Sequence, residues 1–202
     1  LPSERAMMEQ LHRSRPTIRE ALRMLEQGGY VASTHGASGA VVQQLTVDGV
    51  EQPLTAMLQL NQISLEELGE YRAVNDGTIA GWAALRRTED DLASLENCLA
   101  AAEQSLGDYR RFAELDVRFH GLLSRATGNQ VAVIVTEVLG NVEQHILLKK
   151  MSTLNDGEQL ALARRILERH REILDAIRRQ DADAAKQAMR EHTRAAGTDL
   201  KV

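Results

Sequence analysis

The sequence has very little cysteine and few aromatic residues. Cys98 is the single cysteine among 202 residues, so no disulfide can form within the chain. Its position among leucines in a predicted helix indicates a small core residue rather than a nucleophile. Two Phe, three Tyr and one Trp leave the core to Leu, Ile, Val, Ala and Met, which is typical of helical bundles. The composition therefore favours a mainly α fold.

A long apolar run is also missing. No stretch approaches the roughly 18 apolar residues that are needed to span a bilayer. The first residues, Leu1-Pro2-Ser3-Glu4-Arg5, do not form the apolar core of a signal peptide. We therefore expect a cytoplasmic protein with no membrane partner.

Basic charge is scarce and unevenly distributed. The net charge is −5, which alone argues against a nucleic-acid-binding protein. Residues 1–44, however, contain five Arg and four Glu and so carry +1, which leaves −6 on the rest of the chain. This distribution favours a protein in which only the N-terminal segment contacts phosphate.

The first 44 residues have the pattern of a helix-turn-helix followed by a β-hairpin. Ser3 is a suitable N-cap for a helix over 4–11, and Ser14 for a second helix that ends at Gly28-Gly29. Strands are predicted at 30–33 and 40–43. We therefore predict a winged helix-turn-helix domain over residues 1–44. A connecting segment over 45–62 follows, partly helical around 50–60.

The second helix of such a domain lies in the major groove with its N-terminal residues at the base edges. Arg15 and Arg19 are four residues apart and share one face, where guanidinium groups can pair with guanine or phosphate. Ser14 and Thr17 can bind phosphate oxygens beside the helix N-terminus. Alternatively, the two arginines are solvated and pair with neighbouring Glu residues. The predicted DNA-binding residues are Arg5, Ser14, Arg15, Thr17, Arg19, His35 and Gly36.

From Ile63 onward the pattern is helical throughout. Helices are predicted over 64–86, 89–106, 108–127, 130–150, 158–179 and 181–197. Gly107, Gly128-Asn129 and Asn155-Asp156-Gly157 separate them. Six helices of this length are expected to form one antiparallel bundle over 63–202.

Three of these helices place a histidine on or beside an apolar stripe. His170 and His192 lie at the centres of two stripes, and Asp116 and His120 point the same way from the 108–127 helix. A lone buried histidine is usually a hydrogen-bonded core residue, but several unpaired polar groups are costly to bury. One divalent cation would satisfy all four groups, and the donor set suits Zn²⁺, Ni²⁺, Mn²⁺ or Fe²⁺ better than Ca²⁺. Spacing alone leaves the metal-bound and metal-free alternatives open.

Arg72 lies on the apolar stripe of the 64–86 helix, so its charge is buried or lines a cavity. It either forms a structural ion pair with an acid on a helix or binds the carboxylate of a small organic acid. Asn75, one turn on, and Asn141 and His145 on the 130–150 helix are weaker candidates for the same effector pocket.

The run LPSERAMMEQLHRSRPTIREALRMLEQGGYV closely resembles the winged-helix signature of the GntR family, with its leading L-P-S-E-R and its S-R-x-T-[IV]-R-E-A-L core. The resemblance implies DNA contacts from Arg5, Arg15, Thr17, Arg19, His35 and Gly36. Family members normally carry another helix before L-P-S-E-R. This sequence starts at that motif, so either the N-terminus was lost or left out, or the head is incomplete, and we expect the chain as given to bind DNA poorly.

Residues 65–189 resemble the FCD effector domain of FadR-type GntR regulators. The matching motifs are E-x-R at 70–72, D-x-x-F-H-x-x-L at 116–123, A-x-G-N at 126–129 and H-x-x-I-x-x-A-I at 170–177. Many members of that group hold a divalent metal through one Asp and three His. The matching positions here are Asp116, His120, His170 and His192. The resemblance also favours Arg72 as the partner of an effector carboxylate. Gly77 and Gly81 depart from the Ala/Leu-rich run of the family and leave the pocket shape open.

We therefore predict a DNA-binding transcriptional regulator, more specifically a repressor, whose operator affinity is controlled by a small carboxylate bound at a metal site, with Zn²⁺ the first choice. The resemblance implies a homodimer, in which the effector changes the separation or angle of the two heads. The rival prediction is a metal-dependent hydrolase or oxygenase that uses the Asp/His₃ site. We favour a protein that is not an enzyme, because no acid is clearly placed as a general base and the Arg-bearing head would be unexplained. A metal-free, purely structural pocket is a third alternative.

Overall fold

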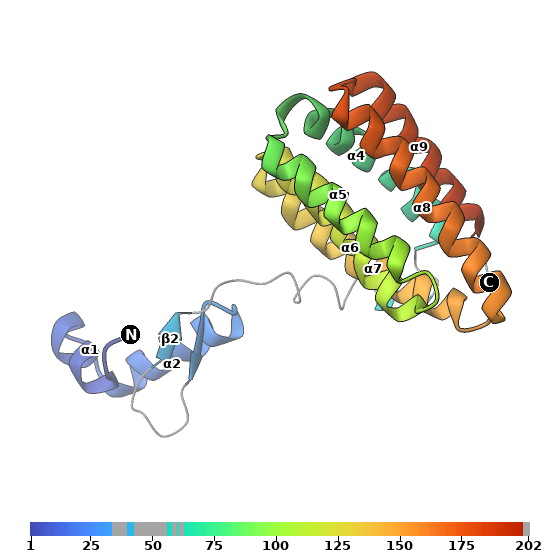
Figure 1. The fold of residues 1–202 in the computed structure, drawn as a ribbon. Helices are drawn as coiled ribbons and strands as arrows, with labels where there is room; N and C mark the ends of the chain where they lie inside the picture. Colours follow the sequence, from blue (N-terminus) through green and yellow to red (C-terminus); the bar gives the residue numbers. More distant parts are fainter. Residues whose placement is uncertain (34–39, 43–55, 58–59, 61–62, 200–202) are drawn as a thin grey trace. The chain divides into compact units, whose positions relative to one another are not determined.

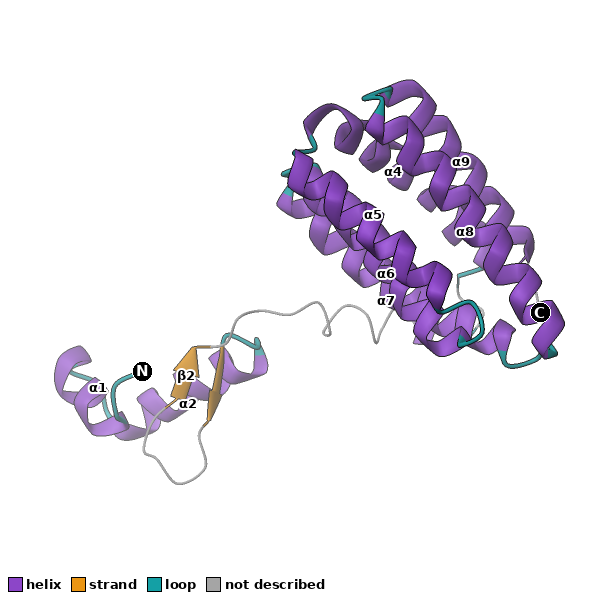
Figure 2. Ribbon diagram, viewed as in Figure 1, coloured by secondary structure: helices purple, strands orange, loops and turns teal. Residues whose placement is uncertain are grey.

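The computed structural model describes residues 1–33, 40–42, 56–57, 60 and 63–199. They belong to two compact units, Leu1–Thr46 and Val47–Val202. Helices and strands carry the labels of Figure 1. The described chain is mainly helical with one small sheet, which confirms the predicted fold class (Figure 2).

The N-terminal unit, called the head below, consists of two helices and a two-stranded antiparallel sheet. Its elements are α1 (Glu4–Leu11), α2 (Arg15–Gln27), β1 (Val31–Ser33) and β2 (Ala40–Val42). The hydroxyl of Ser3 accepts a hydrogen bond from the amide of Ala6 at 3.2 Å and so caps α1, as predicted. The predicted wing tip, His35 and Gly36, lies outside the described residues, as does most of the 45–62 segment.

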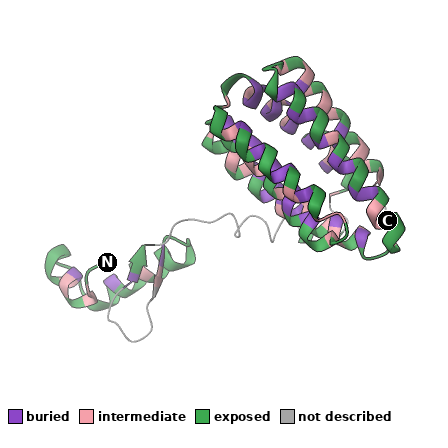
Figure 3. Cartoon of the chain, in the orientation of Figure 1, coloured by how far each residue is buried: buried purple, intermediate pink, exposed green. Residues whose placement is uncertain are grey.

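The head buries few of its described side chains. Met7, Ile18, Val31 and Ala40 are its buried hydrophobic residues. Among the residues of α2, Ile18 is the buried one. The second helix of the helix-turn-helix therefore presents most of its surface outward (Figure 3).

The C-terminal unit, called the body below, is a bundle of six helices in its described part. They are α4 (Leu65–Arg86), α5 (Glu89–Gln104), α6 (Tyr109–Ala126), α7 (Gln130–Met151), α8 (Asp156–Arg178) and α9 (Ala182–Asp199). The helix α8 begins earlier than predicted because the Asn155 side chain accepts a hydrogen bond from the amide of Glu158 at 3.0 Å, and the Glu158 carboxylate accepts one from the amide of Asn155 at 3.0 Å. Gly157 therefore lies in the first turn of α8 rather than in a break.

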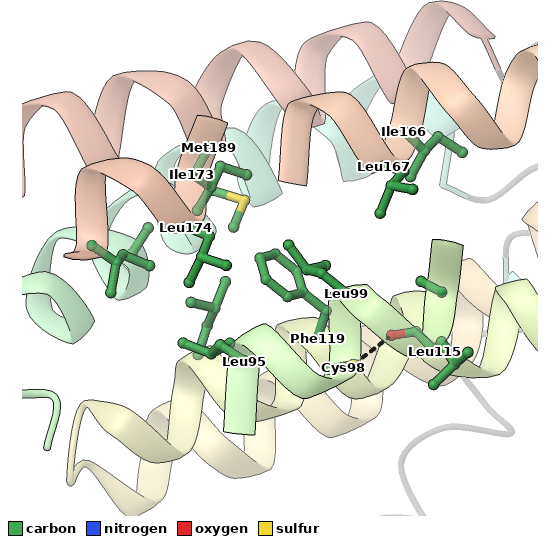
Figure 4. Packing of buried hydrophobic residues seen from close by; sticks show 14 of the residues in the cluster. Leu95, Cys98, Leu99, Leu115, Phe119, Ile166, Leu167, Ile173, Leu174 and Met189 are labelled. Atoms are coloured by element: carbon green, nitrogen blue, oxygen red, sulfur yellow. Dashed lines mark hydrogen bonds between the residues drawn. The ribbon is translucent and has the colours of Figure 1, made fainter. Parts of the chain in front are cut away.

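The six helices form two groups of three, with α4, α8 and α9 in one and α5, α6 and α7 in the other (Figure 1). Between the groups, α6 packs against α4, and α5 packs against α8. Leu95, Phe119, Ile173 and Met189 are fully buried where the groups meet (Figure 4). Cys98 is buried there too, and its thiol donates to the carbonyl of Leu115 at 3.5 Å. Burial raises the pKa of the Cys98 thiol, which agrees with a core role.

Two glycines allow α4 and α9 to approach closely. A Cβ at Gly77 would lie 2.9 Å from Cγ of Arg190, and one at Gly81 would lie 3.2 Å from the carbonyl oxygen of Ala182. The departure of these positions from the Ala/Leu-rich pattern is thus explained by packing against α9.

Among the described helices, α7 is the one that is long and apolar enough to cross a membrane, which the sequence analysis did not anticipate. This is weak evidence for a membrane span, because core helices of bundles meet the same criteria. In the structure α7 packs along α6, and part of its surface is buried within the bundle.

Candidate metal centre and DNA-binding surface

Three histidines from three helices meet inside the body. The ring centroids of His120 (α6), His170 (α8) and His192 (α9) lie 4.6–5.2 Å apart, and a ligand nitrogen of each lies within 4.8 Å of the others. All three are buried, and one ring nitrogen of each has no hydrogen-bond partner among the described residues. Buried polar atoms are rarely left unsatisfied in this way, so a further group is expected between the rings.

Asp116 completes this set from one turn before His120. Its Oδ1 lies 3.6 Å from Nε2 of His170. Burial raises the pKa of the Asp116 carboxyl to about 7, against the opposing effect of the nearby Arg72 charge. Burial, followed by the charge of a neighbouring histidine, holds the pKa of each of the three imidazoles well below the ordinary range.

The four groups are suited to a divalent transition metal. At neutral pH the imidazoles are uncharged and their nitrogen lone pairs are available, which is the form that binds metal. The ring of Phe119 stacks on His170 at a centroid distance of 4.3 Å and fixes its plane. The structure thus brings together the four residues that the sequence analysis selected as ligands.

A buried charged cluster lies beside the candidate metal centre. Arg72 on α4 is 4% exposed and pairs with Asp76 one turn along the same helix at 2.7 Å. It also pairs with Glu143 on α7. A carboxylate oxygen of Glu143 lies within 4.8 Å of ligand atoms of Asp116 and His120. The structural ion pair that was one of the two alternatives for Arg72 is therefore present, and it adjoins the candidate metal ligands.

Glu143 was not among the site residues predicted from the sequence. This residue lies four positions after Leu139 and four before Leu147, both buried, so it falls on an apolar stripe of α7. An acid on such a stripe is the same signal that identified Arg72, and it would have identified Glu143.

Two small cavities flank Glu143. One, of about 30 Å³, is lined by Arg72, Glu143 and Thr193 among others. The other, of about 20 Å³, is lined by Asp116, Glu143 and His192 among others. Each has room for about one or two water molecules.

The weaker pocket candidates lie elsewhere. Asn75 lines a separate groove of about 540 Å³ between α4 and α7, and its amide donates to Asp76 at 3.1 Å. His145 is exposed, with Nδ1 2.9 Å from the carbonyl oxygen of Asn141. Asn75, Asn141 and His145 are absent from the linings of the two small cavities, so their part in effector binding stays a prediction.

The predicted DNA-binding arginines lie on the surface of the head. Arg15 and Arg19 both pair with Glu4 of α1, at 3.2 and 3.1 Å, and their side chains are 65% and 66% exposed. Arg5 pairs with Glu9 at 3.1 Å. In the absence of DNA, these arginines thus pair with nearby Glu residues, as the alternative prediction stated. Exposed pairs of this kind are weak, so a DNA phosphate can replace the carboxylate.

The start of α2 is suited to binding phosphate. Ser14 makes no side-chain capping bond, and its hydroxyl shares a hydrogen bond with Thr17 at 2.9 Å. The amides of Arg15 and Thr17 therefore donate no hydrogen bond to the Ser14 side chain, and Pro16 between them has no N–H to satisfy. A hollow of about 480 Å³ nearby is lined by Arg5, Arg13 and Arg15 among others.

Comparison with known proteins identifies both units. Residues 1–42 match the bacterial regulatory proteins of the gntR family, and residues 67–195 match the FCD domain. This chain belongs to the GntR family. It is a FadR-type GntR transcriptional regulator with an FCD domain, as the sequence motifs indicated.

Its relatives include named GntR repressors. The HTH-type transcriptional repressor NanR of Enterobacter sp. (strain 638) is 30% identical over 195 residues, which cover 95% of this chain and 73% of the relative. The NanR of Cronobacter sakazakii is 28% identical with the same coverage. The solved structure of Streptococcus agalactiae GntR is 27% identical, with a TM-score of 0.79 over 98% of this chain and 88% of that one. Escherichia coli McbR/YncC, at 18% identity and a TM-score of 0.60 over 98% of this chain and 85% of that one, shares the fold.

Proposed function

We propose that this GntR regulator is a repressor whose FCD body binds one divalent transition metal, Zn²⁺ first, and a small carboxylate effector. The metal ligands in this proposal are Asp116, His120, His170 and His192. The observation that carries it is the convergence of three buried, neutral imidazoles, each with one ring nitrogen that has no hydrogen-bond partner in the described chain.

The chemistry of the donors supports this assignment. Three imidazole nitrogens and one carboxylate oxygen suit Zn²⁺, Ni²⁺, Mn²⁺ or Fe²⁺, and such ions accept a further oxygen ligand from a small molecule. Arg72 adjoins the site and can pair with a carboxylate in a bidentate manner. A small organic acid would thus be recognised at one end by the metal and at the other by Arg72.

The head is proposed to read operator DNA in the cytoplasm. Its DNA-contacting residues would be Arg5, Ser14, Arg15, Thr17 and Arg19, with His35 and Gly36 at the wing. The exposure of the α2 surface and the uncapped amides at its start support this role. The relatives are named as repressors, and we propose no enzymatic activity.

We further propose that the protein is a homodimer that covers the groove between α4 and α7. Tyr71, Val74 and Val131 line this groove, and each is more than half exposed. A contiguous apolar surface of this kind is typical of a protein contact. Two heads held by one dimeric body would contact two operator half-sites, and the effector would act by changing their separation. Light scattering would give twice the chain mass; a monomer mass at working concentrations would contradict the homodimer.

The head and the body can be tested separately with one pair of variants. DNA is first selected from a random-sequence library by the wild-type protein. Arg19→Ala is expected to weaken binding to that DNA about tenfold or more, because it removes one base or phosphate contact. Arg171→Ala removes an equally charged, half-exposed side chain from the body and should leave DNA binding unchanged.

Fluorescence anisotropy measures the DNA affinity, and elemental analysis measures the metal. Both variants should contain about one metal ion per chain, like the wild-type protein. Equal DNA affinity of Arg19→Ala and wild type would contradict the role of the head. A wild-type protein that neither retains nor takes up Zn²⁺ would contradict the role of the body.

A further inference from the structure

Glu143 stands between the two groups that would hold an effector. It extends from α7 to pair with Arg72, while its carboxylate also lies within 4.8 Å of the ligand atoms of Asp116 and His120. Its side chain is 16% exposed, so it is largely enclosed. One internal carboxylate therefore occupies the position that a carboxylate effector would need, with a guanidinium on one side and metal ligands on the other.

The space around Glu143 supports this interpretation. The cavities of about 30 and 20 Å³ both include Glu143 and Ala196 in their linings. Neither cavity can hold an organic acid, because each has room for only about one or two water molecules. Glu143 is the charged residue that lines both cavities, and its departure would free Arg72.

The balance of charge leads to the same conclusion. Asp76 and Glu143 pair with Arg72, and Asp116 has a carboxylate oxygen within 4.8 Å of one of Glu143, so the three carboxylates, when ionised, exceed the single guanidinium by two negative charges. A bound divalent cation would neutralise that excess. An additional effector carboxylate would return an unpaired negative charge to a buried site, which is costly. Exchange of Glu143 for the effector carboxylate keeps the cluster neutral.

We propose that Glu143 is an internal competitor of the effector. This inference rests on the proposed metal and carboxylate site. Without effector, the Glu143 carboxylate occupies the anion position between Arg72 and the metal. The effector binds by displacing it, so its apparent affinity is reduced by the fraction of molecules in which Glu143 has left. Glu143 thereby favours acids that bind both the metal and Arg72. A ligand that binds only one of the two does not replace the Glu143 carboxylate at the other.

The test uses the full chain loaded with Co²⁺, whose visible spectrum reports its ligands, and acetate as the probe. Wild type is compared with Glu143→Gln, which removes the competing charge and keeps the size of the side chain. Glu137→Gln is the matched control, since Glu137 is exposed on the same helix. Glu143→Gln is expected to bind acetate about tenfold more tightly than wild type, and Glu137→Gln to match wild type. The Co²⁺ spectrum of Glu143→Gln without acetate should also differ from that of wild type.

Three results would overturn the inference. The first is equal acetate affinity in Glu143→Gln and wild type, and the second is Glu143→Gln that holds Co²⁺ and binds no acetate. If Glu143→Gln does not fold, Glu143→Asp takes its place, because it withdraws the carboxylate by one methylene and should give an intermediate gain in acetate affinity. The third result is a Glu143→Asp variant that shows no gain in acetate affinity. Failure of the wild-type protein to bind Co²⁺ is a different result, because it refutes the proposed metal site itself and the inference with it.

Discussion

Replacement of His192 by alanine should remove most of the stabilisation that zinc gives to this protein. His192 contributes one of the three buried imidazoles, and the ring is 5% exposed. In the metal-free protein, the variant loses the packing of the ring but also loses a buried nitrogen without a hydrogen-bond partner. These two effects oppose each other, so we expect a change of about 2 kcal/mol or less in the unfolding free energy without zinc.

The effect with zinc is larger. Free Zn²⁺ at a thousand times its dissociation constant stabilises the folded wild-type protein by about 4 kcal/mol. Loss of one of four ligands is expected to weaken binding about 100-fold, which lowers the stabilisation at the same zinc concentration to about 1.4 kcal/mol. At about 2–4 °C per kcal/mol, the zinc-dependent rise in Tm should fall from about 8–16 °C to about 3–6 °C.

Scanning calorimetry at about pH 7.5, where the imidazoles are uncharged, measures this difference with zinc and with a chelator. The matched control is His145→Ala, because His145 is exposed on α7 and belongs to neither candidate ligand group. It should keep the full zinc-dependent rise in Tm. The reasoning would be refuted by an equal rise in His192→Ala and wild type.

Two further predictions concern proton release and the core. Because the pKa of Asp116 is about 7 and the imidazoles are already neutral, zinc binding should release about half a proton at pH 7 and about one tenth at pH 8, as calorimetry in two buffers of different ionisation enthalpy can measure. Asp116→Asn should abolish this release, and a release that does not depend on pH would contradict the assignment. Leu95→Ala, at a fully buried position, should lower the unfolding free energy by about 2–5 kcal/mol, against about 0.5 kcal/mol or less for Leu85→Ala at a position that is 62% exposed. Urea unfolding measures both changes, and similar losses in the two variants would be the contrary result.

The starts of α4, α5, α6 and α7 could be predicted to within a residue because their signals are local, whereas that of α8 was placed two residues late. Ser64 and Thr88 each accept a hydrogen bond from the amide three residues on, and Asp108 and Asn129 cap their helices in a similar way. The pairing of helices could not be predicted in the same way. The helices α4 and α9 pack against each other although they are the first and last helices of the body in sequence. The spacing of residues within either helix does not indicate that it packs against the other.

The candidate site was only partly predictable for the same reason. Helical periodicity shows which residues share a face, and this placed Arg72 and the candidate metal ligands on or beside apolar stripes. It does not show which helix that face meets. Asn75, three positions after Arg72, faces the groove, whereas Asp76, four positions after, pairs with Arg72. Periodicity alone could have placed Glu143 on an apolar stripe of α7, but its partners, Arg72 on one side and Asp116 and His120 on the other, were known only once α7 was placed beside α4 and α6.

The ion pair between Arg72 and Glu143 has a mechanical consequence. It fastens α4 to α7, and these two helices also form the walls of the groove lined by Tyr71 and Val131. A molecule that breaks this ion pair therefore acts directly on the two helices that line the groove, without a further helix between the buried site and the groove. If a second copy of the chain occupies the groove, α4 and α7 determine two things at once. They determine how the effector binds in the buried site and how the two copies fit together.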